Sequence, residues 1–267
     1  MQKDKKIHLP GYLECFRSKI ESSIVGSIWI TPHYGQPSLT DSKFAGNPYL
    51  PKSHLHPKDS NGQIMHLLAQ INFAQLPSIP PFPSKGLLQF FLSTKFDQID
   101  EKKVELLYQE DFKVRYYPNI LHENQLIQDF SDLESKSSFL IQNEKGLAFL
   151  PKHEPVSASD YRREKFLQVS PFDGEYISED ERTFEDIYFE YFLAAEHKIG
   201  GYPYFIEYDT RKNSSFLKRF DTLLLQIVSN DEQGIMYGDS GVIKFFINQD
   251  ALRNLDFSSV YFIAEQF

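Results

Sequence analysis

The block Lys43–Leu50, with the sequence KFAGNPYL, returns later in the chain as Lys198–Phe205, KIGGYPYF. Two further blocks recur in the same order: Leu67–Ile71 (LLAQI) returns as Leu223–Ile227 (LLLQI), and Gly86–Ser93 (GLLQFFLS) returns as Gly241–Asn248 (GVIKFFIN). Each block recurs 155 or 156 residues further along. Self-similarity at a nearly constant offset indicates that one structural unit was copied. The sequence therefore predicts two homologous lobes that share a core.

The composition favours sheet over helix. Of the 267 residues, 41% are hydrophobic and 15% are aromatic, including 24 Phe and 15 Tyr. Aromatic side chains pack well on a pleated, half-buried surface. We therefore expect an α+β, β-dominated fold, made of mostly antiparallel sheet with a few flanking helices, whose two homologous lobes come from an internal duplication.

The hydrophobic pattern places the elements along the chain. Apolar and β-branched runs predict strands at 24–30, 67–73, 87–93, 113–117, 223–228, 242–248 and 259–263. Helical spacing predicts helices near residues 13–20, 159–168, 184–195 and 216–220. The expected organisation is one compact domain, with an N-terminal helix and strand (1–30), a first repeat lobe (31–125), a connecting region with helices (126–196) and a second repeat lobe (197–267).

The helix expected at residues 184–195 has the clearest signals. Thr183 and Asp186 have the spacing of a capping box, and Gly200–Gly201 can end the helix. Its apolar stripe is expected to dock on a sheet.

Charge and motifs limit the partners. The formal charge of −9 and the pI near 5.4 argue against nucleic-acid binding, which needs a basic face, but permit a basic protein partner. No apolar stretch has the length of a membrane helix or the form of a signal peptide, so we expect a cytoplasmic monomer without membrane contact. Cys15 is the only cysteine. No nucleotide-binding motif is present, and we expect no cofactor.

The densest run of acidic residues lies ahead of and within the helix expected at residues 184–195. A solvated face is one interpretation of such a run. The other is electrostatic steering toward a basic partner, for instance a cationic toxin if this were an immunity-type protein. The run comprises Asp173, Glu175, Glu179, Asp180, Glu181, Glu185, Asp186 and Glu190.

Several of the repeated blocks also carry a family resemblance. The motifs are GNPYLPK at 46–52, LLAQIN at 67–72, GLLQFF at 86–91, HKIGGYP at 197–203, LLLQI at 223–227 and IMYGD at 235–239. Together they resemble the YwqG-like family, a bacterial domain of unknown function. The resemblance implies a compact, β-rich α+β domain with an internal duplication and no established reaction. The chain departs from the family pattern at His56 and Tyr237, where tryptophan is usual, and at Val228, where an acidic residue is usual.

Gln70 and Gln226 interrupt apolar strands at equivalent positions of the two copies. An unpaired buried amide would cost roughly 1 to 3 kcal/mol. Each amide could bond to the backbone, or to its counterpart across a pseudo-two-fold axis. Alternatively, both could line a polar cleft between the lobes and orient a ligand.

Other polar residues accompany the motifs of the second copy. Lys198, Tyr202, Asp209, Arg211 and Asp239 are candidate ligand- or partner-binding residues, because binding residues concentrate at loop ends beside a rigid sheet. The alternative for Asp209 and Arg211 is a turn with a surface ion pair.

Three histidines, His54, His56 and His66, could converge on zinc, but no supporting motif is present. We interpret them as solvated loop residues and predict no metal site.

No catalytic residue is identified by motif. The sequence favours a non-enzymatic interaction or binding module that uses its acidic surface. The alternative is a small-ligand binder or hydrolase with a site in the groove between the two lobes.

Overall fold

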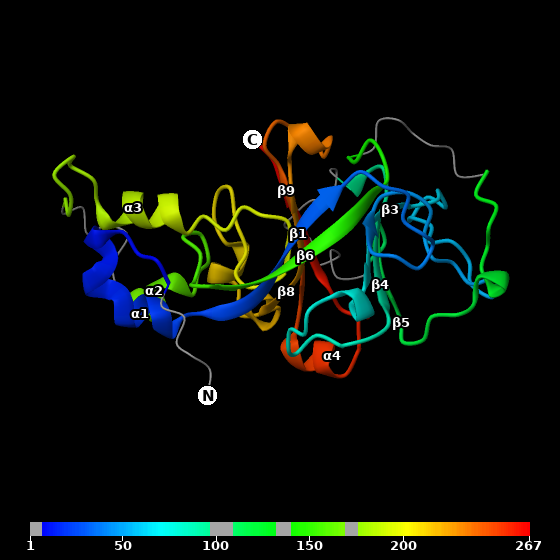
Figure 1. The fold of residues 1–267 in the computed structure, drawn as a ribbon, viewed down its shortest axis with the longest axis horizontal. Coiled ribbons are helices and arrows are strands. Elements are labelled where there is room, and N and C mark those ends of the chain that lie inside the picture. Colours follow the sequence, from blue (N-terminus) through cyan, green and yellow to red (C-terminus); the bar gives the residue numbers. More distant parts are fainter. Residues whose placement is uncertain (1–6, 97–108, 132–139, 169–175) are drawn as a thin grey trace.

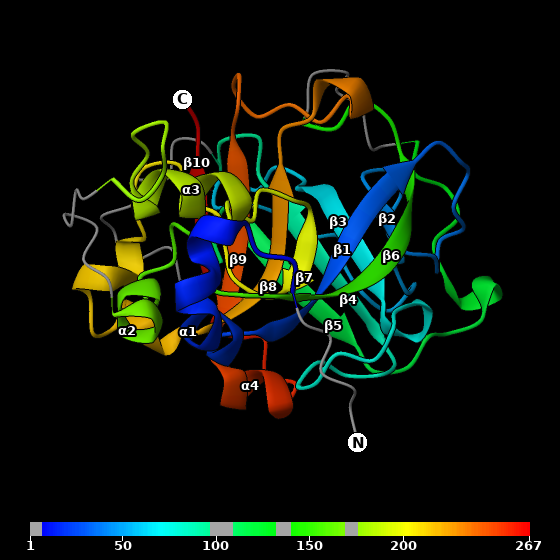
Figure 2. The ribbon, with the colours of Figure 1, turned by 60° about the vertical axis from the view of Figure 1, so that its left-hand side comes forward.

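The computed structural model describes residues 7–96, 109–131, 140–168 and 176–267, and its strands form one antiparallel sheet (Figures 1 and 2). The strands are β1 (Val25–His33), β2 (Lys43–Phe44), β3 (His66–Asn72), β4 (Leu87–Leu92), β5 (Phe112–Tyr117), β6 (Lys145–Glu154), β7 (Lys198–Gly200), β8 (Thr222–Val228), β9 (Val242–Ile247) and β10 (Tyr261–Glu265). The helices are α1 (Arg17–Ser22), α2 (Arg163–Leu167), α3 (Phe184–Tyr191) and α4 (Gln249–Arg253), and 3-10 turns include η1 (Gly11–Phe16), η2 (Phe73–Gln75) and η6 (Thr210–Asn213). The β-dominated architecture predicted from composition is confirmed.

The order of strands in the sheet is β10-β9-β8-β7-β1-β6-β2-β3-β4-β5. The long strands β1 and β6 lie at its centre and pair over nine residues, from Val25 with Glu154 to His33 with Gly146. We call β2–β5 the first half of the sheet and β7–β10 the second half. The sheet is strongly curved, so that the two halves face each other (Figure 2).

The two halves use the same strand pairing. Lys43 of β2 pairs with Gln70 of β3, and Lys198 of β7 pairs with Gln226 of β8. The register shifts by one residue at Leu68 in β3 and again at Leu224 in β8.

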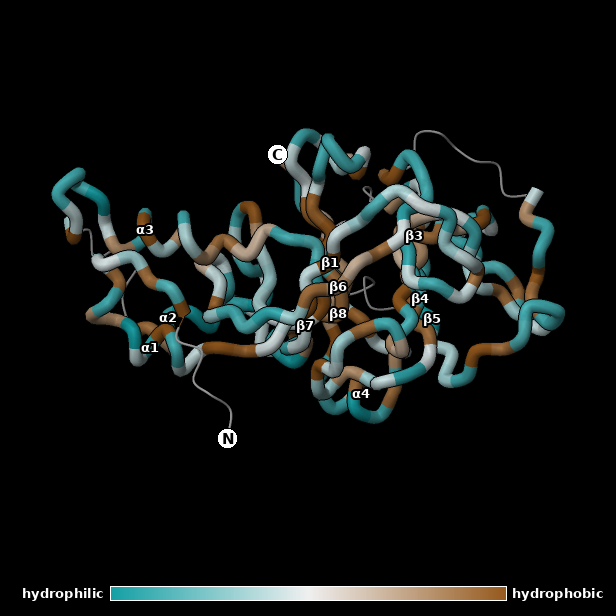
Figure 3. The backbone as a smooth tube through the Cα atoms, viewed as in Figure 1, coloured by the Kyte–Doolittle hydropathy of each residue, from teal (hydrophilic) through white to brown (hydrophobic). Residues whose placement is uncertain are grey.

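Phenylalanine side chains from the inner faces of both halves form one shared core. The ring centres of Phe90 and Phe245 are 4.8 Å apart, and those of Phe112 and Phe262 are 5.1 Å apart. Aromatic contacts at such distances stabilise a core beyond the area that they bury. Figure 3 shows hydrophobic residues along these central strands and hydrophilic residues in the peripheral loops.

The helices α1, α2 and α3 pack on one another beside the sheet (Figure 1). Their small core contains Leu13, Ile20, Leu167, Ile187 and Tyr188, and none of its described members lies in a strand. The expectation that the stripe of α3 docks on a sheet is therefore wrong, because the N-terminal helices cover that stripe. In the described ranges, no helix has both the length and the hydrophobicity needed to cross a membrane.

The predicted capping box of α3 is confirmed. Thr183 Oγ1 accepts a hydrogen bond from the Asp186 N–H, and the Asp186 carboxylate accepts one from the Thr183 N–H at 2.8 Å. The helix ends earlier than predicted, at Tyr191. The reason is that the Gln226 side chain bonds the carbonyls of Ala194 and Glu196, which holds that segment in a non-helical path.

The central strand β6 lies in the region expected to be a connection with helices. Its sequence gave little sign of a strand, because most of its residues are partly exposed and it contains Pro151, which cannot donate to a ladder. In the described chain, β2 pairs with β6 only at Lys145 and Gly146. One edge of β6 therefore has no strand beside it at Pro151, where a proline is tolerated.

Candidate functional site

The two candidate glutamines, Gln70 and Gln226, lie on the outer faces of the sheet, away from the shared core. Successive side chains of a strand point to opposite faces. Leu225 and Ile227 belong to the shared core, so Gln226 between them points outward. The same alternation directs Gln70 outward between Ala69 and Ile71.

Both glutamines are fully buried and bond mainly to the backbone. Gln226 Oε1 accepts from the Tyr204 N–H at 2.8 Å, and its Nε2 donates to the carbonyls of Ala194 and Glu196. Gln70 Oε1 likewise accepts from the Tyr49 N–H at 2.8 Å. Its Nε2 donates to the carbonyls of Leu39 and Asp41. Each amide thus ties a loop to its strand, as in the first interpretation of these residues.

Lys198 and Tyr202 meet at one carboxylate, that of Glu154 at the end of β6. Glu154 Oε1 accepts from Lys198 Nζ at 2.8 Å and from the Tyr202 N–H at 3.3 Å. Its Oε2 accepts from Trp29 Nε1 at 3.0 Å. Lys198 is wholly buried and Glu154 is 13% exposed in its side chain. We call Glu154, Lys198, Trp29 and the neighbouring Glu196 the Glu154 cluster.

Glu196 is the least satisfied member of the Glu154 cluster. Its Oε2 is buried and, among the described residues, has no hydrogen-bond partner. Burial raises the pKa of Glu196, and the negative charge of Glu154 adds to the effect, while Lys198 opposes it. A carboxyl whose pKa is raised beside a second carboxyl resembles acid–base pairs in enzymes. Here, however, both oxygens of Glu154 are occupied by internal donors, so the cluster joins strands rather than presenting a free base.

Asp209 and Arg211 form an ion pair, but it is not on the surface. Arg211 Nη2 lies 2.7 Å from Asp209 Oδ2, and both side chains are buried. The same nitrogen lies 3.1 Å from Asp160 Oδ2, and Arg162 donates to both carboxylate oxygens of Asp160. Burial alone would raise the pKa of Asp160, but Arg162 and Arg211 lower it.

The interpretation of Asp209 and Arg211 as a surface ion pair is therefore wrong. The pair is buried because the guanidinium of Arg211 packs 4.4 Å above the ring of Phe246 on the outer face of β9. Two arginines and two aspartates balance each other in this network. The network also contacts the candidate residue Tyr202, because the Arg162 guanidinium lies 4.8 Å from the centre of the Tyr202 ring.

The other candidates lie apart. Asp239 is exposed in a turn before β9. His54 is exposed, and burial lowers the pKa of His56, with smaller contributions from Arg115 and His66. Within the described ranges, no group of three or more His, Cys, Asp or Glu side chains could hold a metal ion.

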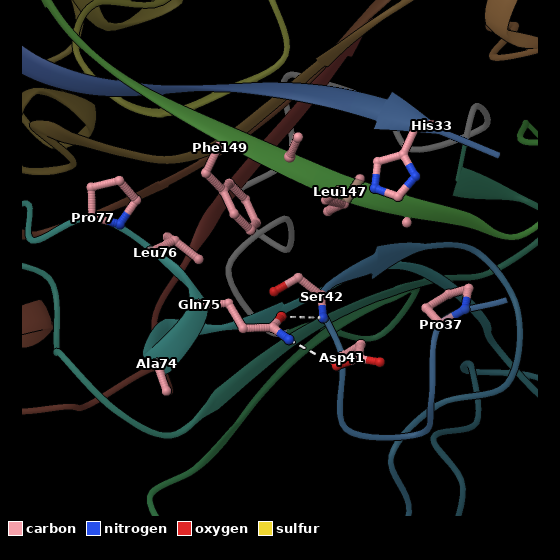
Figure 4. Close-up of a pocket in the computed structure, with 12 residues that line it drawn as sticks. His33, Pro37, Asp41, Ser42, Ala74, Gln75, Leu76, Pro77, Leu147 and Phe149 are labelled. Carbon is pink, nitrogen blue, oxygen red and sulfur yellow. Dashed lines mark hydrogen bonds between the residues drawn. The ribbon is translucent and has the colours of Figure 1, made fainter. Parts of the chain in front are cut away.

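A pocket of about 620 Å³ opens where β2 stops pairing with β6 (Figure 4). His33 and Asp41 contribute polar groups, and Leu76, Leu147 and Phe149 contribute apolar walls. The sequence offered no signal for this pocket, because its lining comes from separate segments at residues 33–42, 74–77 and 146–149.

The exposed surface of α3 is acidic, and two aromatic side chains of the helix, Phe189 and Tyr191, are exposed. Phe189 is 46% exposed, and Glu185 and Asp186 precede it by four and three residues, which places them beside it on the helix. Glu190 follows Asp186 by four residues and extends the acidic surface. Glu185 pairs with Arg163 and Glu190 with Arg182. The turn before the helix leaves Glu179, Asp180 and Glu181 exposed. Asp173 and Glu175 of the predicted acidic run lie outside the described residues.

A comparison with protein families decides where the chain belongs. The model of a domain of unknown function, DUF1963, matches residues 42–265. The chain belongs to the DUF1963 family. A comparison with curated proteins finds no match.

The DUF1963 region runs from β2 to β10 and includes α3, Glu154, Lys198 and both halves of the sheet. The central strand β1, with Trp29 and His33, precedes it. The sheet is therefore completed by a strand from outside the family region. The sequence did not point to Glu154, Glu196 or Phe189. The one available signal was the lysine that opens both copies of the first repeated block, Lys43 and Lys198, because a lysine that becomes buried needs a carboxylate nearby.

Proposed function

We propose that this DUF1963 protein is a non-enzymatic binding module that contacts a basic protein partner through the exposed face of α3. The observation that carries the proposal is the position of Phe189, an exposed aromatic side chain on an otherwise acidic helix face. Aromatic side chains dominate the energy of protein interfaces when a partner desolvates them.

Charge supports a basic partner. The ion pairs with Arg163 and Arg182 offset both glutamates on α3, but Asp186 has no such pair among the described residues, and Glu179, Asp180 and Glu181 extend the negative surface beyond the start of the helix. Complementary charge mainly accelerates association. An immunity-type protein that neutralises a cationic toxin would benefit from such a face.

The alternative is a small-ligand binder or hydrolase that acts in the groove between the two halves. The contacts between Phe90 and Phe245 and between Phe112 and Phe262 favour the binding module, because these rings occupy the space that such a groove would need.

We also infer that the two halves descend from one duplicated unit of the YwqG-like type. Support comes from two contacts that occupy equivalent positions in the two halves although the side chains that make them differ. Gln89 Nε2 donates to the Tyr49 carbonyl at 2.8 Å, and Lys244 Nζ, which follows Gln89 by 155 residues, donates to the Tyr204 carbonyl at 2.8 Å.

Comparative capture from native lysate tests the binding module. The full-length protein, a Phe189→Ser variant and a variant with Glu179, Asp180 and Glu181 changed to lysine are used as baits. Leu55→Ser, which changes an apolar side chain 87% exposed in the first half, is the matched control.

The proposal expects a basic protein that is captured by the wild type and by Leu55→Ser but lost from both α3 baits. Its association rate with the purified wild type should fall steeply with added salt. A set of captured proteins that is the same for all four baits would overturn the proposal.

A further inference from the structure

We propose that the pocket between β6 and the segments 37–42 and 74–77 binds a small organic cation, namely a primary amine or guanidine joined to an apolar body. The proposal is independent of the α3 face, which lies at the other end of the molecule from β2 and β3 (Figure 1). It follows from the lining of the pocket, which combines polar groups with apolar side chains.

Asp41 supplies negative charge at one end of the pocket. Its Oδ1 accepts from Gln75 Nε2 at 2.7 Å, and its Oδ2 accepts from the Ser38 N–H at 2.8 Å. These bonds hold the carboxylate in place, and each oxygen keeps a further lone pair for a ligand. Burial raises the pKa of Asp41, but these hydrogen bonds and the charge of Lys43 outweigh it and lower the pKa.

No side chain in the described chain forms a salt bridge with Asp41. Lys43, whose charge favours the ionised form of Asp41, places its Nζ 2.9 Å from Glu144 Oε1 instead. Asp41 therefore stays ionised while a charged ligand can still reach it.

His33 provides a second acceptor. A carbonyl can only accept, so the 3.1 Å contact between His33 Nδ1 and the Tyr34 oxygen places the proton of the neutral ring on Nδ1. Nε2 then carries a lone pair. The imidazole lies against Gly146, where an added Cβ would come within 2.9 Å of Nε2. The glycine thus leaves the space that the ring occupies at the edge of the pocket.

Another part of the lining is apolar. Phe149 and Leu147 come from β6 and Leu76 and Pro77 from the segment after η2, and Figure 4 shows Phe149 and Leu76 on the side of the pocket away from His33 and Pro37. A volume of about 620 Å³ lies in the range that accommodates drug-sized ligands.

The two walls together select the ligand class. A neutral ligand would cover Asp41 without compensating its charge, and an anion would be repelled by it. A cation can pair with Asp41 while its apolar part covers Phe149. The net charge of −9 raises the local concentration of cations around the protein.

Binding of 3-phenylpropylamine to the full-length protein, measured by calorimetric titration, tests the proposal. The matched neutral probe is 3-phenylpropan-1-ol, which has the same apolar body. The variants are Asp41→Asn, which removes the charge but keeps an acceptor for Ser38, and Asp231→Asn, which removes an exposed charge from the 3-10 turn at residues 231–233.

We expect the amine to bind the wild type and Asp231→Asn equally, and to bind Asp41→Asn at least tenfold more weakly. The alcohol should bind the wild type at least tenfold more weakly than the amine. Absence of amine binding, equal binding of amine and alcohol, or unchanged binding to a folded Asp41→Asn variant would each overturn the proposal. The comparison of the two probes on the wild type remains decisive if Asp41→Asn does not fold.

Discussion

Lys198 Nζ lies 2.8 Å from Glu154 Oε1, and the lysine side chain is wholly buried. The lysine at the equivalent position of the first block, Lys43, is buried to the same degree and bonds Glu144 at 2.9 Å. The two carboxylates differ in exposure, because Glu154 is 13% exposed and Glu144 is 30% exposed. Two buried lysines at equivalent positions are thus neutralised by carboxylates that differ in their exposure to water.

Removing the carboxylate charge should cost more stability at Glu154 than at Glu144. Loss of one partner from a buried ion pair leaves an uncompensated charge, at a cost of about 3 kcal/mol or more. We expect that loss for Glu154→Gln and about 1 kcal/mol for Glu144→Gln, where water reaches the site, both from urea unfolding. Equal losses at the two positions would show that burial does not set the strength of these pairs.

Gly201 should tolerate alanine far less well than Gly62 does. Both have positive φ, at 70° and 77°, a conformation in which alanine lowers the free energy of unfolding by about 1 kcal/mol. An added Cβ at Gly201 would overlap Glu154 Oε1 and lie 2.9 Å from Ser27 Cβ, whereas nothing lies within 4 Å of it at Gly62.

The expected losses in unfolding free energy are about 3 kcal/mol for Gly201→Ala and about 1 kcal/mol for Gly62→Ala. The difference between the two variants, read from urea titrations, isolates the clash from the cost of the backbone conformation. Similar values would mean that Glu154 moves aside without loss.

Gln70→Ala should destabilise the protein by about 3 kcal/mol, because the buried Tyr49 N–H loses its acceptor and Gln89 Nε2 loses one of two. Gln128→Ala is the control, since that exposed amide makes one hydrogen bond to the Glu123 carbonyl. Thermal unfolding followed by circular dichroism measures both. A loss for Gln70→Ala no larger than that of the control would contradict a structural role for the amide.

The sequence predicted the longer strands with a strong apolar pattern, but not the short buried strands β2 and β7. The expected strand at 223–228 corresponds to β8 at Thr222–Val228, and the one at 242–248 to β9 at Val242–Ile247. In both, apolar side chains and one outward polar residue give a strong local pattern. β6 could not be predicted in the same way, because its hydrophobic pattern is weak and its place beside β1 depends on contacts more than a hundred residues apart.

The candidate site was predictable only where the chain repeats. Gln226 was found because it has an equivalent in Gln70, and Lys198 because it lies in a motif of the second copy. Glu154 and Asp41 were not, since each acts through partners from distant segments, such as Trp29 for Glu154 and Gln75 for Asp41. The spacing of residues along the chain cannot predict contacts between such distant segments.

His197 should make the stability of the protein depend on pH in the acid range. Its ring is buried beside Phe44, with centres 5.6 Å apart. The Val228 N–H donates to Nδ1 at 3.2 Å, so the proton of the neutral ring is on Nε2, near Gln233 Oε1. Burial lowers the pKa of His197 from 6.5 to about 4, and Gln233 only partly opposes this shift.

The direction of the pH effect on stability follows from proton uptake by His197. Between pH 6.5 and about 4, the unfolded chain binds a proton at His197 that the folded protein does not. Stability from the neutral ring is therefore complete above pH 6.5 and is lost as the pH falls toward 4, by about 3 kcal/mol in total. His197→Asn keeps an acceptor for Val228 but does not titrate, so its unfolding free energy should fall less steeply over this range, by about 1.4 kcal/mol per pH unit.

Urea titrations of both proteins at intervals from pH 7 to pH 4 provide the measurement. Carboxylates titrate in the same range in both proteins, so their contribution cancels in the difference between the two curves. Parallel curves would mean that His197 binds its proton equally in the folded and unfolded states, which a buried ring that accepts from a backbone N–H cannot do without losing that bond.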